Sequence, residues 1–240
     1  RHVRAAEVSG KPLRYYDFVM AAFVAVLLLS NVIGAAKRSV IDLPLIGPWP
    51  YGAGVLFFPL SYIIGDMLTE VYGYARARRV IWTGFAALTF LAIMSAVVVA
   101  LPPAPGWNDQ PAYEAVFGSS WRIVMASMMA FWVGEFANSL VLAKMKLKDN
   151  GRRMGWRFVA STIVGQGFDS LIFYPVAFYG SANWPTSELF KTVLSQWAIK
   201  AGWEVLLLPI TVAIVLAMKR REGLDVYDEG TDFSPFHAKV

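Results

Sequence analysis

The chain has 240 residues, of which 57% are hydrophobic and 16% are charged, and its mean hydropathy is +0.48. An average soluble domain is about half apolar and about a quarter charged, so this composition is typical of a membrane protein. The absence of cysteine excludes disulfides, thiol catalysis and thiolate metal sites, and because the only histidines, His2 and His237, lie in the polar tails, a histidine-based metal site or proton relay within the membrane is excluded as well.

Six apolar segments predict six transmembrane helices of about 20 residues each. In chain order they are expected at about residues 16–36, 51–72, 79–101, 121–143, 158–180 and 196–218. Pro59 is expected to kink the second helix, because proline removes a backbone hydrogen bond. The sequence therefore predicts an all-α, polytopic membrane protein in which residues 1–240 form a single transmembrane domain with short tails.

Lysine and arginine residues gather on one side of the predicted bundle. Seventeen of the 22 lie in the two tails and in the loops after the second and fourth helices, and five lie on the other side. Because short, positively charged loops stay in the cytoplasm, both termini are predicted to be cytoplasmic, which an even number of helices satisfies. Topology thus explains the net charge of +5, so the expected partners are membrane lipids and not nucleic acid.

Ionisable side chains interrupt four of the predicted helices. Each costs at least a few kcal/mol at membrane depth unless it faces a partner, a cavity or a ligand. They occur with another polar residue three or four positions away, which places both on one face of a helix. These pairs are Asp66 with Glu70, Glu135 with Asn138, Gln166 with Asp169, and Lys200 with Glu204, and Asn31 near the end of the first helix is a further candidate to line a vestibule.

Some of these residues also have a purely structural interpretation. Glu70 could pair with an arginine of the following loop, Asn138 could join helices by hydrogen bonds, and Lys200 could neutralise Glu204. As a set, however, acids and carboxamides with few bases suit a ligand rich in donors, because a carboxylate accepts two parallel N–H groups. A guanine-like edge fits this description, and so would a cation, an amine or a proton.

Three blocks of the sequence carry a family resemblance. The first is residues 58–74, FPLSYIIGDMLTEVYGY, with three arginines shortly after it. The second lies within residues 156–170 and includes GQGFDS, and the third runs from Lys200 through Glu204 and Pro209 to the tail at residues 225–236. These blocks resemble the queuosine precursor transporter family, and with Asn31 they span nearly the whole chain.

The resemblance implies a function in import. It implies uptake of 7-cyano-7-deazaguanine and 7-aminomethyl-7-deazaguanine, flat bases with a guanine edge, through the bacterial inner membrane for salvage of the tRNA base queuosine. The family also resembles the substrate-binding subunits of energy-coupling vitamin importers but acts without their ATPases, and this chain contains no G-x-x-x-x-G-K-[ST] loop. No catalytic residue, cofactor or metal is expected.

Carried onto this sequence, the resemblance implies a substrate site made by residues of all three blocks. Asp169 or Glu135 is expected to bind the donor edge of the base, with Gln166 at its carbonyl or ring N–H. The full set of expected site residues is Asn31, Asp66, Glu70, Glu135, Asn138, Gln166, Asp169, Lys200 and Glu204.

Other functions stay open on the sequence alone. A transporter of another nucleobase-like or vitamin-like solute would have a similar interior. An intramembrane aspartyl protease would need Asp66 and Asp169 to form a dyad that shares a proton. A scaffold without substrate would leave the interior acids unexplained. Small residues on the third helix, namely Gly84, Ala86 and Ala87, would permit close packing, including a homodimer.

Overall fold

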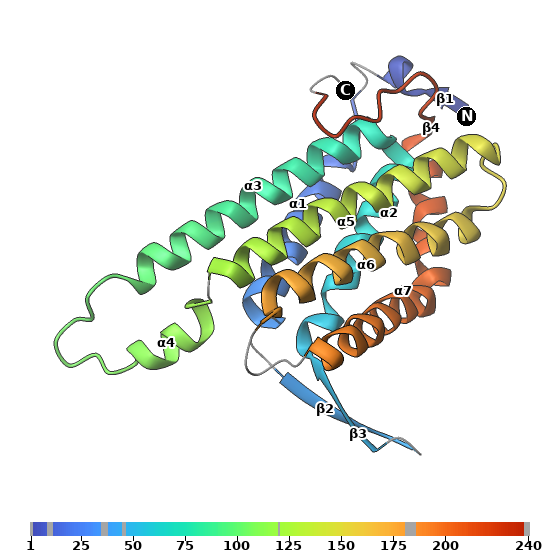
Figure 1. The fold of residues 1–240 in the computed structure, drawn as a ribbon. Coiled ribbons are helices and arrows are strands. Elements are labelled where there is room, and N and C mark those ends of the chain that lie inside the picture. Colours follow the sequence, from blue (N-terminus) through green and yellow to red (C-terminus); the bar gives the residue numbers. More distant parts are fainter. Residues whose placement is uncertain are drawn as a thin grey trace.

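The computed structural model describes residues 2–8, 12–34, 38–44, 47–119, 121–180 and 186–237, and these form an elongated bundle of helices (Figure 1). The helices are α1 (Tyr16–Leu29), α2 (Phe58–Tyr72), α3 (Tyr74–Val99), α4 (Gln110–Phe117), α5 (Trp121–Lys148), α6 (Met154–Phe178) and α7 (Thr186–Glu222). A π-helical turn, Ser30–Gly34, extends α1.

The helices are those of a multi-pass membrane protein. By length and composition, five helical segments of the described chain could cross a membrane: Tyr16–Ile33, Ala53–Tyr72, Tyr74–Val99, Gln110–Lys148 and Leu189–Glu222. The fifth predicted span corresponds to α6, which has 25 residues but is interrupted by Gln166 and Asp169. Because α6 packs against both α5 and α7, these polar groups meet other helices.

Helix α2 is the centre of the bundle. It packs against α1, α3, α5 and α7, and most of its side chains are buried. On its other side α5 runs beside α6, and α6 runs beside α7 (Figure 1). The polar faces of α2, α5, α6 and α7 therefore turn toward a common interior, whereas α1 and α3 contribute mainly apolar packing such as Phe23 and Leu27.

Glycines bring α5 and α6 into close contact. A Cβ atom at Gly165 would lie 2.7 Å from Cβ of Asn138 and 3.1 Å from the carbonyl oxygen of Gly134. Small residues at such crossings let helix backbones approach closely in membrane proteins. Gly84 has a similar role within the chain, because a Cβ there would lie 2.9 Å from the Phe23 ring. Gly84 is thus used inside the bundle, and a homodimer through this face stays a prediction.

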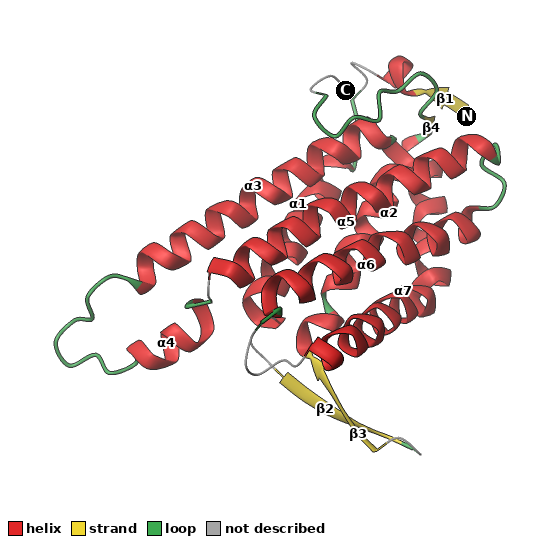
Figure 2. Ribbon diagram, viewed as in Figure 1, coloured by secondary structure: helices red, strands yellow, loops and turns green. Residues whose placement is uncertain are grey.

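Short strands lie at the two ends of the bundle, as the colours of Figure 2 show. Strand β1 (His2–Arg4) pairs in parallel with β4 (Asp225–Tyr227), which joins the two terminal segments at one end. At the opposite end β2 (Arg38–Leu43) forms an antiparallel hairpin with β3 (Gly47–Gly52). The prediction of an all-α chain missed these strands and also α4, since each is too short to give a clear periodic pattern.

The helix boundaries differ from the predicted ones in two places that matter. The second helix was expected from residue 51 with a kink at Pro59, but β3 and a 3-10 turn, Ala53–Leu56, precede α2, which begins at Phe58. Pro59 therefore lies in the first turn, where its missing N–H breaks no hydrogen bond, and it causes no kink. The last helix was expected at 196–218 but runs over residues 186–222 as α7.

Candidate functional site

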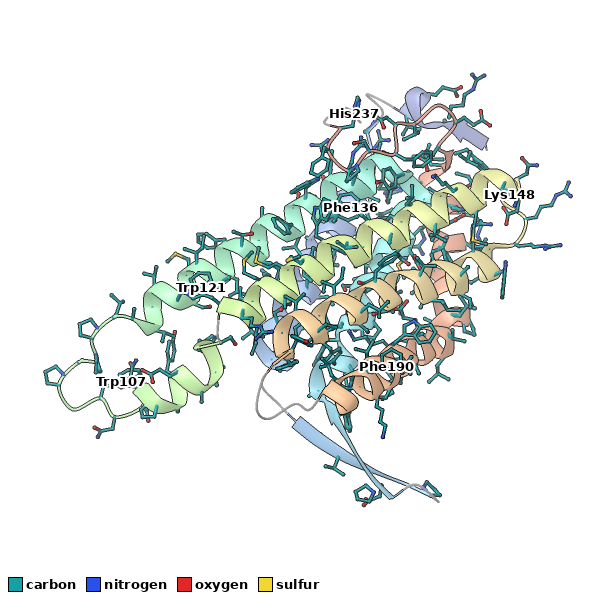
Figure 3. The ribbon with its side chains drawn as sticks, in the orientation of Figure 1. Trp107, Trp121, Phe136, Lys148, Phe190 and His237 are labelled. Carbon is teal, nitrogen blue, oxygen red and sulfur yellow. The ribbon has the colours of Figure 1, made fainter. Side chains whose placement is uncertain are left out.

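The bundle contains a cavity of about 1210 Å³, whose lining includes residues of β3 and α4. The β2–β3 hairpin and α4 lie at the end of the bundle away from the termini (Figure 1). The residues that line it are mainly apolar and aromatic, and they include Trp121 at the start of α5. Figure 3 labels this residue. The polar groups on the wall come from several helices. They include Asn31, Ser61, Tyr62, Ser127, Asp169, Gln196 and Lys200.

Two of the charged residues that line this cavity, Asp169 and Lys200, form an ion pair, and Lys191 is a further charged residue of the lining. Lys200 Nζ on α7 donates to Asp169 Oδ2 on α6 at 2.5 Å, and the two side chains retain 10% and 14% exposure. The ammonium group also lies 5.9 Å from the centre of the Phe58 ring. Lys200 thus forms its ion pair with Asp169 across the helix interface, whereas its helix neighbour Glu204 interacts with it as a further nearby charge. An acceptor and a donor of opposite charge are thus available side by side at the cavity.

A layer of buried polar residues lies one helical turn further into the bundle. Each of three residues in this layer lies three or four positions, or about one helical turn, from a cavity residue of its own helix. Asp66 follows Tyr62 on α2, Gln166 precedes Asp169 on α6, and Glu204 follows Lys200 on α7. Asn138 Nδ2 on α5 donates to Asp66 Oδ1 at 2.8 Å. Thr162 Oγ1 donates to Glu204 Oε2 at 2.6 Å, and Gln166 Nε2 donates to Glu204 Oε1.

Glu135 on α5 belongs to this layer but has no such partner. Its side chain is fully buried, and neither carboxylate oxygen has a hydrogen-bond partner among the described residues. The carboxylate lies against the backbone of α2, because a Cβ at Gly65 would be 2.7 Å from Glu135 Oε2. Glu135 interacts electrostatically with Asp66, Asp169 and Glu204. Of the two acids expected to hold the base, only Asp169 lines the cavity.

Beyond this layer is a second, very small cavity of about 10 Å³, bordered by Asp66, Thr162 and Glu204. Its volume is about that of one water molecule's occupied space. The polar interior therefore continues from the large cavity toward the end of the bundle that carries the termini.

At that end Glu70 is the centre of a cluster of bases. Its carboxylate accepts two hydrogen bonds from Arg157, at 2.7 and 2.9 Å, and one from Lys219. Lys146 donates to the Glu70 carbonyl oxygen at 2.6 Å and to Asp225 at 2.7 Å. Glu70 is thus paired with bases from α5, α6 and α7, and not with an arginine of the loop after the second helix. It does not line the large cavity, and its role in the substrate site stays a prediction.

Asp225 ties the carboxyl-terminal segment to this cluster. Burial alone would raise the pKa of the Asp225 carboxyl, but Lys146 and Lys219 outweigh that effect and hold its pKa below its ordinary value. Lys219 was counted in the carboxyl-terminal tail, but it lies on α7 and bridges Glu70 and Asp225. The exposed bases at the same end, such as Lys148, point away from the bundle (Figure 3).

The structure thus divides the expected site residues into three groups. Asn31, Asp169 and Lys200 line the cavity, Glu70 lies in the cluster of bases, and the others form the buried layer, namely Asp66, Glu135, Asn138, Gln166 and Glu204. Asp66 and Asp169 hydrogen-bond to different partners, so they do not form the dyad of an aspartyl protease.

Several polar residues that line the cavity or bind Glu70 were not predicted from the sequence. Tyr62, Ser61 and Gln196 line the cavity, and Arg157 and Lys146 hold Glu70. A helical signal was present for two of them, since Tyr62 precedes Asp66 by four positions and Gln196 precedes Lys200 by four. The sequence placed Arg157 and Lys146 in a loop because the predicted helices were limited to the apolar segments. In the structure α5 continues to Lys148 and α6 begins at Met154, so both residues lie on helices.

This fold and this cavity define the class: a multi-pass membrane protein whose helices surround a large cavity with a few charged groups on an apolar wall, as a carrier of small molecules requires. A model of the family described as "Putative vitamin uptake transporter" matches residues 52–214. The chain belongs to this family. No solved structure matches the chain.

Three curated relatives agree with the resemblance seen in the sequence blocks. The chain is 32% identical over 161 residues to the "Probable queuosine precursor transporter" of Bacillus subtilis, covering 67% of this chain and 69% of that protein. It is 28% identical over 130 residues to the "Queuosine precursor transporter" of Escherichia coli, covering 54% of this chain and 56% of that protein. A relative with the same name as the first, from Haemophilus influenzae, is 24% identical over 169 residues, covering 69% and 64%. The resemblance is confirmed, and the names agree with the expectation that the protein is not an enzyme.

Proposed function

We propose that the protein imports queuosine precursors, 7-cyano-7-deazaguanine and 7-aminomethyl-7-deazaguanine, across the bacterial inner membrane for the salvage of queuosine in tRNA. Membership of a vitamin uptake transporter family and the names of three relatives support this proposal. The cavity is ample for a bicyclic base, since pockets for drug-sized ligands are typically about 300–1,000 Å³.

The observation that carries the proposal is the Asp169–Lys200 pair on the cavity wall. A guanine-like edge offers two parallel N–H donors next to a carbonyl oxygen. A carboxylate accepts such a pair of donors, and an ammonium group donates to the carbonyl. When the base binds, it takes over the hydrogen bonds that the two side chains make with each other. Phe58 and Phe173, which also line the cavity, supply aromatic surface for a flat ring.

The direction of import follows from the predicted orientation. We infer six spans with α6 as the fifth, and cytoplasmic termini, as the distribution of lysine and arginine predicts. The large cavity then faces the outside, and the Glu70 cluster closes the cytoplasmic end. The state described is therefore one that would receive the base from outside.

Complementation tests the proposal. A bacterium that lacks deazaguanine synthesis but retains the later tRNA-modifying enzymes is supplied with limiting 7-cyano-7-deazaguanine. Expression of this protein is expected to restore queuosine, seen as a mobility shift of the affected tRNAs on a boronate gel. The Asp169→Asn variant is expected to restore less.

The result that contradicts the proposal is equally clear. Correctly inserted wild-type protein that gives no more modified tRNA than an empty vector, with either base, would refute the assignment. In that case binding of other nucleobase-like or vitamin-like solutes to the purified protein distinguishes the remaining transporter functions, with guanine and queuine as the first comparisons.

A further inference from the structure

The buried layer contains a set of unpaired acceptor atoms around Glu135. Among the described residues, both carboxylate oxygens of Glu135, Oδ1 of Asn138 and Oε1 of Gln166 lack a hydrogen-bond partner, and all three side chains are fully buried. The Tyr62 hydroxyl is buried without a partner as well. An unpaired buried acceptor destabilises the folded state, and more so if it is charged, so four such atoms together indicate that a hydrogen-bond donor is missing.

No base of the described chain neutralises Glu135. Lys200 is engaged with Asp169, and Lys146, Arg157 and Lys219 are engaged with Glu70 at the terminal end. The groups of the packed helices that interact electrostatically with Glu135 include Tyr62 and Asp66 of α2, Asp169 of α6 and Glu204 of α7. These are acids or a phenol, so an ionised Glu135 would be a buried charge among like charges.

A shared metal ion is a poor solution for this layer. Within the described residues no group of three or more His, Cys, Asp or Glu side chains is arranged to hold a metal ion. A proton needs only one carboxyl oxygen. Once protonated, Glu135 is neutral and becomes an O–H donor to one of the neighbouring acceptors, which removes both the unpaired charge and part of the donor deficit.

We propose that Glu135 is a proton-binding site distinct from the base-binding cavity, and that the proton it carries is the coupling ion of import. This inference rests on the proposed function and adds its energy source. The balance is simple: an external proton binds the Glu135 carboxylate to form the carboxylic acid, and the same proton is released to the cytoplasm when the carboxylate re-forms. No other atom or electron is transferred.

The position of Glu135 couples binding of the proton to binding of the nucleobase in the large cavity. Glu135 lies in the layer between the large cavity and the small cavity next to Asp66 and Glu204. Tyr62, which interacts electrostatically with Glu135, also lines the large cavity. Asp169 interacts electrostatically with Glu135. A base that takes the Asp169 carboxylate from Lys200 therefore changes the field at Glu135, so that proton binding and base binding influence each other.

Infrared spectroscopy of the purified protein tests the occupancy of the site without any transport. The wild-type protein near neutral pH is expected to show a carbonyl stretching band of protonated carboxyl groups that is weaker in Glu135→Gln, because glutamine has the same shape but no carboxyl group. Glu114→Gln, which removes an exposed acid on α4, is the matched control and should leave the band unchanged. Identical bands in the wild type and Glu135→Gln would overturn the proposal.

Uptake of labelled 7-cyano-7-deazaguanine into proteoliposomes tests the coupling. With one proton per neutral base, an interior one pH unit more alkaline than the outside is expected to sustain about tenfold accumulation by the wild type and by Glu114→Gln, and an uncoupler should abolish it. Glu135→Gln, which mimics the protonated carboxyl group, is expected to bind 7-cyano-7-deazaguanine with an affinity that does not change with pH, and to equilibrate it across the membrane without accumulation.

The outcomes separate the two proposals. Wild-type uptake that reaches equilibrium but never exceeds it, at any pH gradient, overturns proton coupling and leaves the import function intact. Absence of wild-type uptake and binding refutes the import function, and the coupling proposal falls with it. Proton-driven accumulation that persists in Glu135→Gln shows that another group carries the proton and overturns the assignment to Glu135.

Discussion

The Asp169–Lys200 pair illustrates how a charged pair can serve both a resting state and a bound state. The two side chains are mostly buried and form an ion pair with each other. Both keep some exposure and line the cavity, so a ligand in the cavity can reach them. When no nucleobase is bound, the charges of Asp169 and Lys200 neutralise each other. A guanine-like edge offers the same donors and acceptor in the same plane, so that exchange of partners leaves no buried charge unpaired.

Replacing Asp169 by asparagine is expected to weaken binding of 7-cyano-7-deazaguanine by about 10- to 150-fold, or roughly 1.5–3 kcal/mol, the usual loss when a charged hydrogen bond is left unmade. Equilibrium binding to the purified variant measures this. Asp17→Asn, at an exposed position at the start of α1, is the control and should bind like the wild type. Wild-type affinity of a folded Asp169→Asn variant would exclude Asp169 from the base site.

Glu70 has a structural role, because it forms ion pairs with Arg157, Lys146 and Lys219 at the terminal end of the bundle. Removing its charge leaves Arg157, Lys146 and Lys219 at the terminal end without their main acid, although Asp225 and Asp149 still form ion pairs with them. Breaking a buried ion pair from one side costs about 3–5 kcal/mol. Glu70→Gln is therefore expected to lower the melting temperature of the purified protein markedly, whereas Glu114→Gln should not. A variant as stable as the wild type would show that this cluster does not hold the terminal end closed.

At the scale of whole helices, the bundle is built on the close crossing of α5 and α6. At this crossing Gly165 of α6 lies directly against Asn138 and the backbone of α5. The close contact fixes the positions of Gln166 and Asp169 on α6 relative to the polar residues of α5. The positions of the base site and of the buried layer thus depend on one interface that admits no side chain.

Gly165→Ala is expected to destabilise the protein by about 1–3 kcal/mol, the usual cost of overpacking, and to weaken base binding, because α6 must move away from Asn138. Gly202→Ala on α7 is the matched control. A Cβ at Gly202 meets nothing within 4 Å, so that alanine should stabilise the helix by up to about 1 kcal/mol. Thermal unfolding with and without base compares the two, and equal effects of both substitutions would contradict the role of the crossing.

On the scale of the whole molecule, the two ends of the bundle differ in chemistry. One end carries both terminal segments, joined by β1 and β4, together with the Glu70 cluster and most of the exposed bases. The other end carries the hairpin, α4 and the large cavity (Figure 1). Because the termini lie at the same end, the chain crosses the bundle an even number of times, which agrees with six spans.

Reporter fusions test this orientation. A phosphatase that is active only in the periplasm is expected to be inactive when fused after residue 240 and active when inserted at Gly106, in the exposed loop between α3 and α4. The lysine- and arginine-free loop at 102–120 motivates the second position. The reverse pattern would place the termini outside and the cavity inside, and would overturn the proposed direction of the resting state.

Much of the architecture could be predicted from the sequence, because the membrane restricts the solutions. Apolar length, the sites of charge interruption and the loop bases are local properties, so the helices, the shared polar faces and the family resemblance were accessible without a structure. Eight of the nine expected site residues do lie at the cavity or in the buried layer behind it. The boundaries of α2 and α7 and the short strands were not accessible, since tertiary contacts decide them.

The sequence by itself determined that this chain is a membrane protein with interior acids, because burial of apolar helices and the cost of buried charge depend on residue type alone. Only the tertiary structure decided which charge meets which. Lys200 pairs with Asp169 and not with its own helix neighbour Glu204, Glu70 pairs with Arg157 from a distant segment, and Glu135 has no counter-charge among the described residues. Partners of this kind lie on different helices: Asp169 and Lys200 are 31 residues apart, Glu70 and Arg157 are 87 apart, and Glu70 and Lys219 are 149 apart. Their pairing therefore follows from how the helices cross.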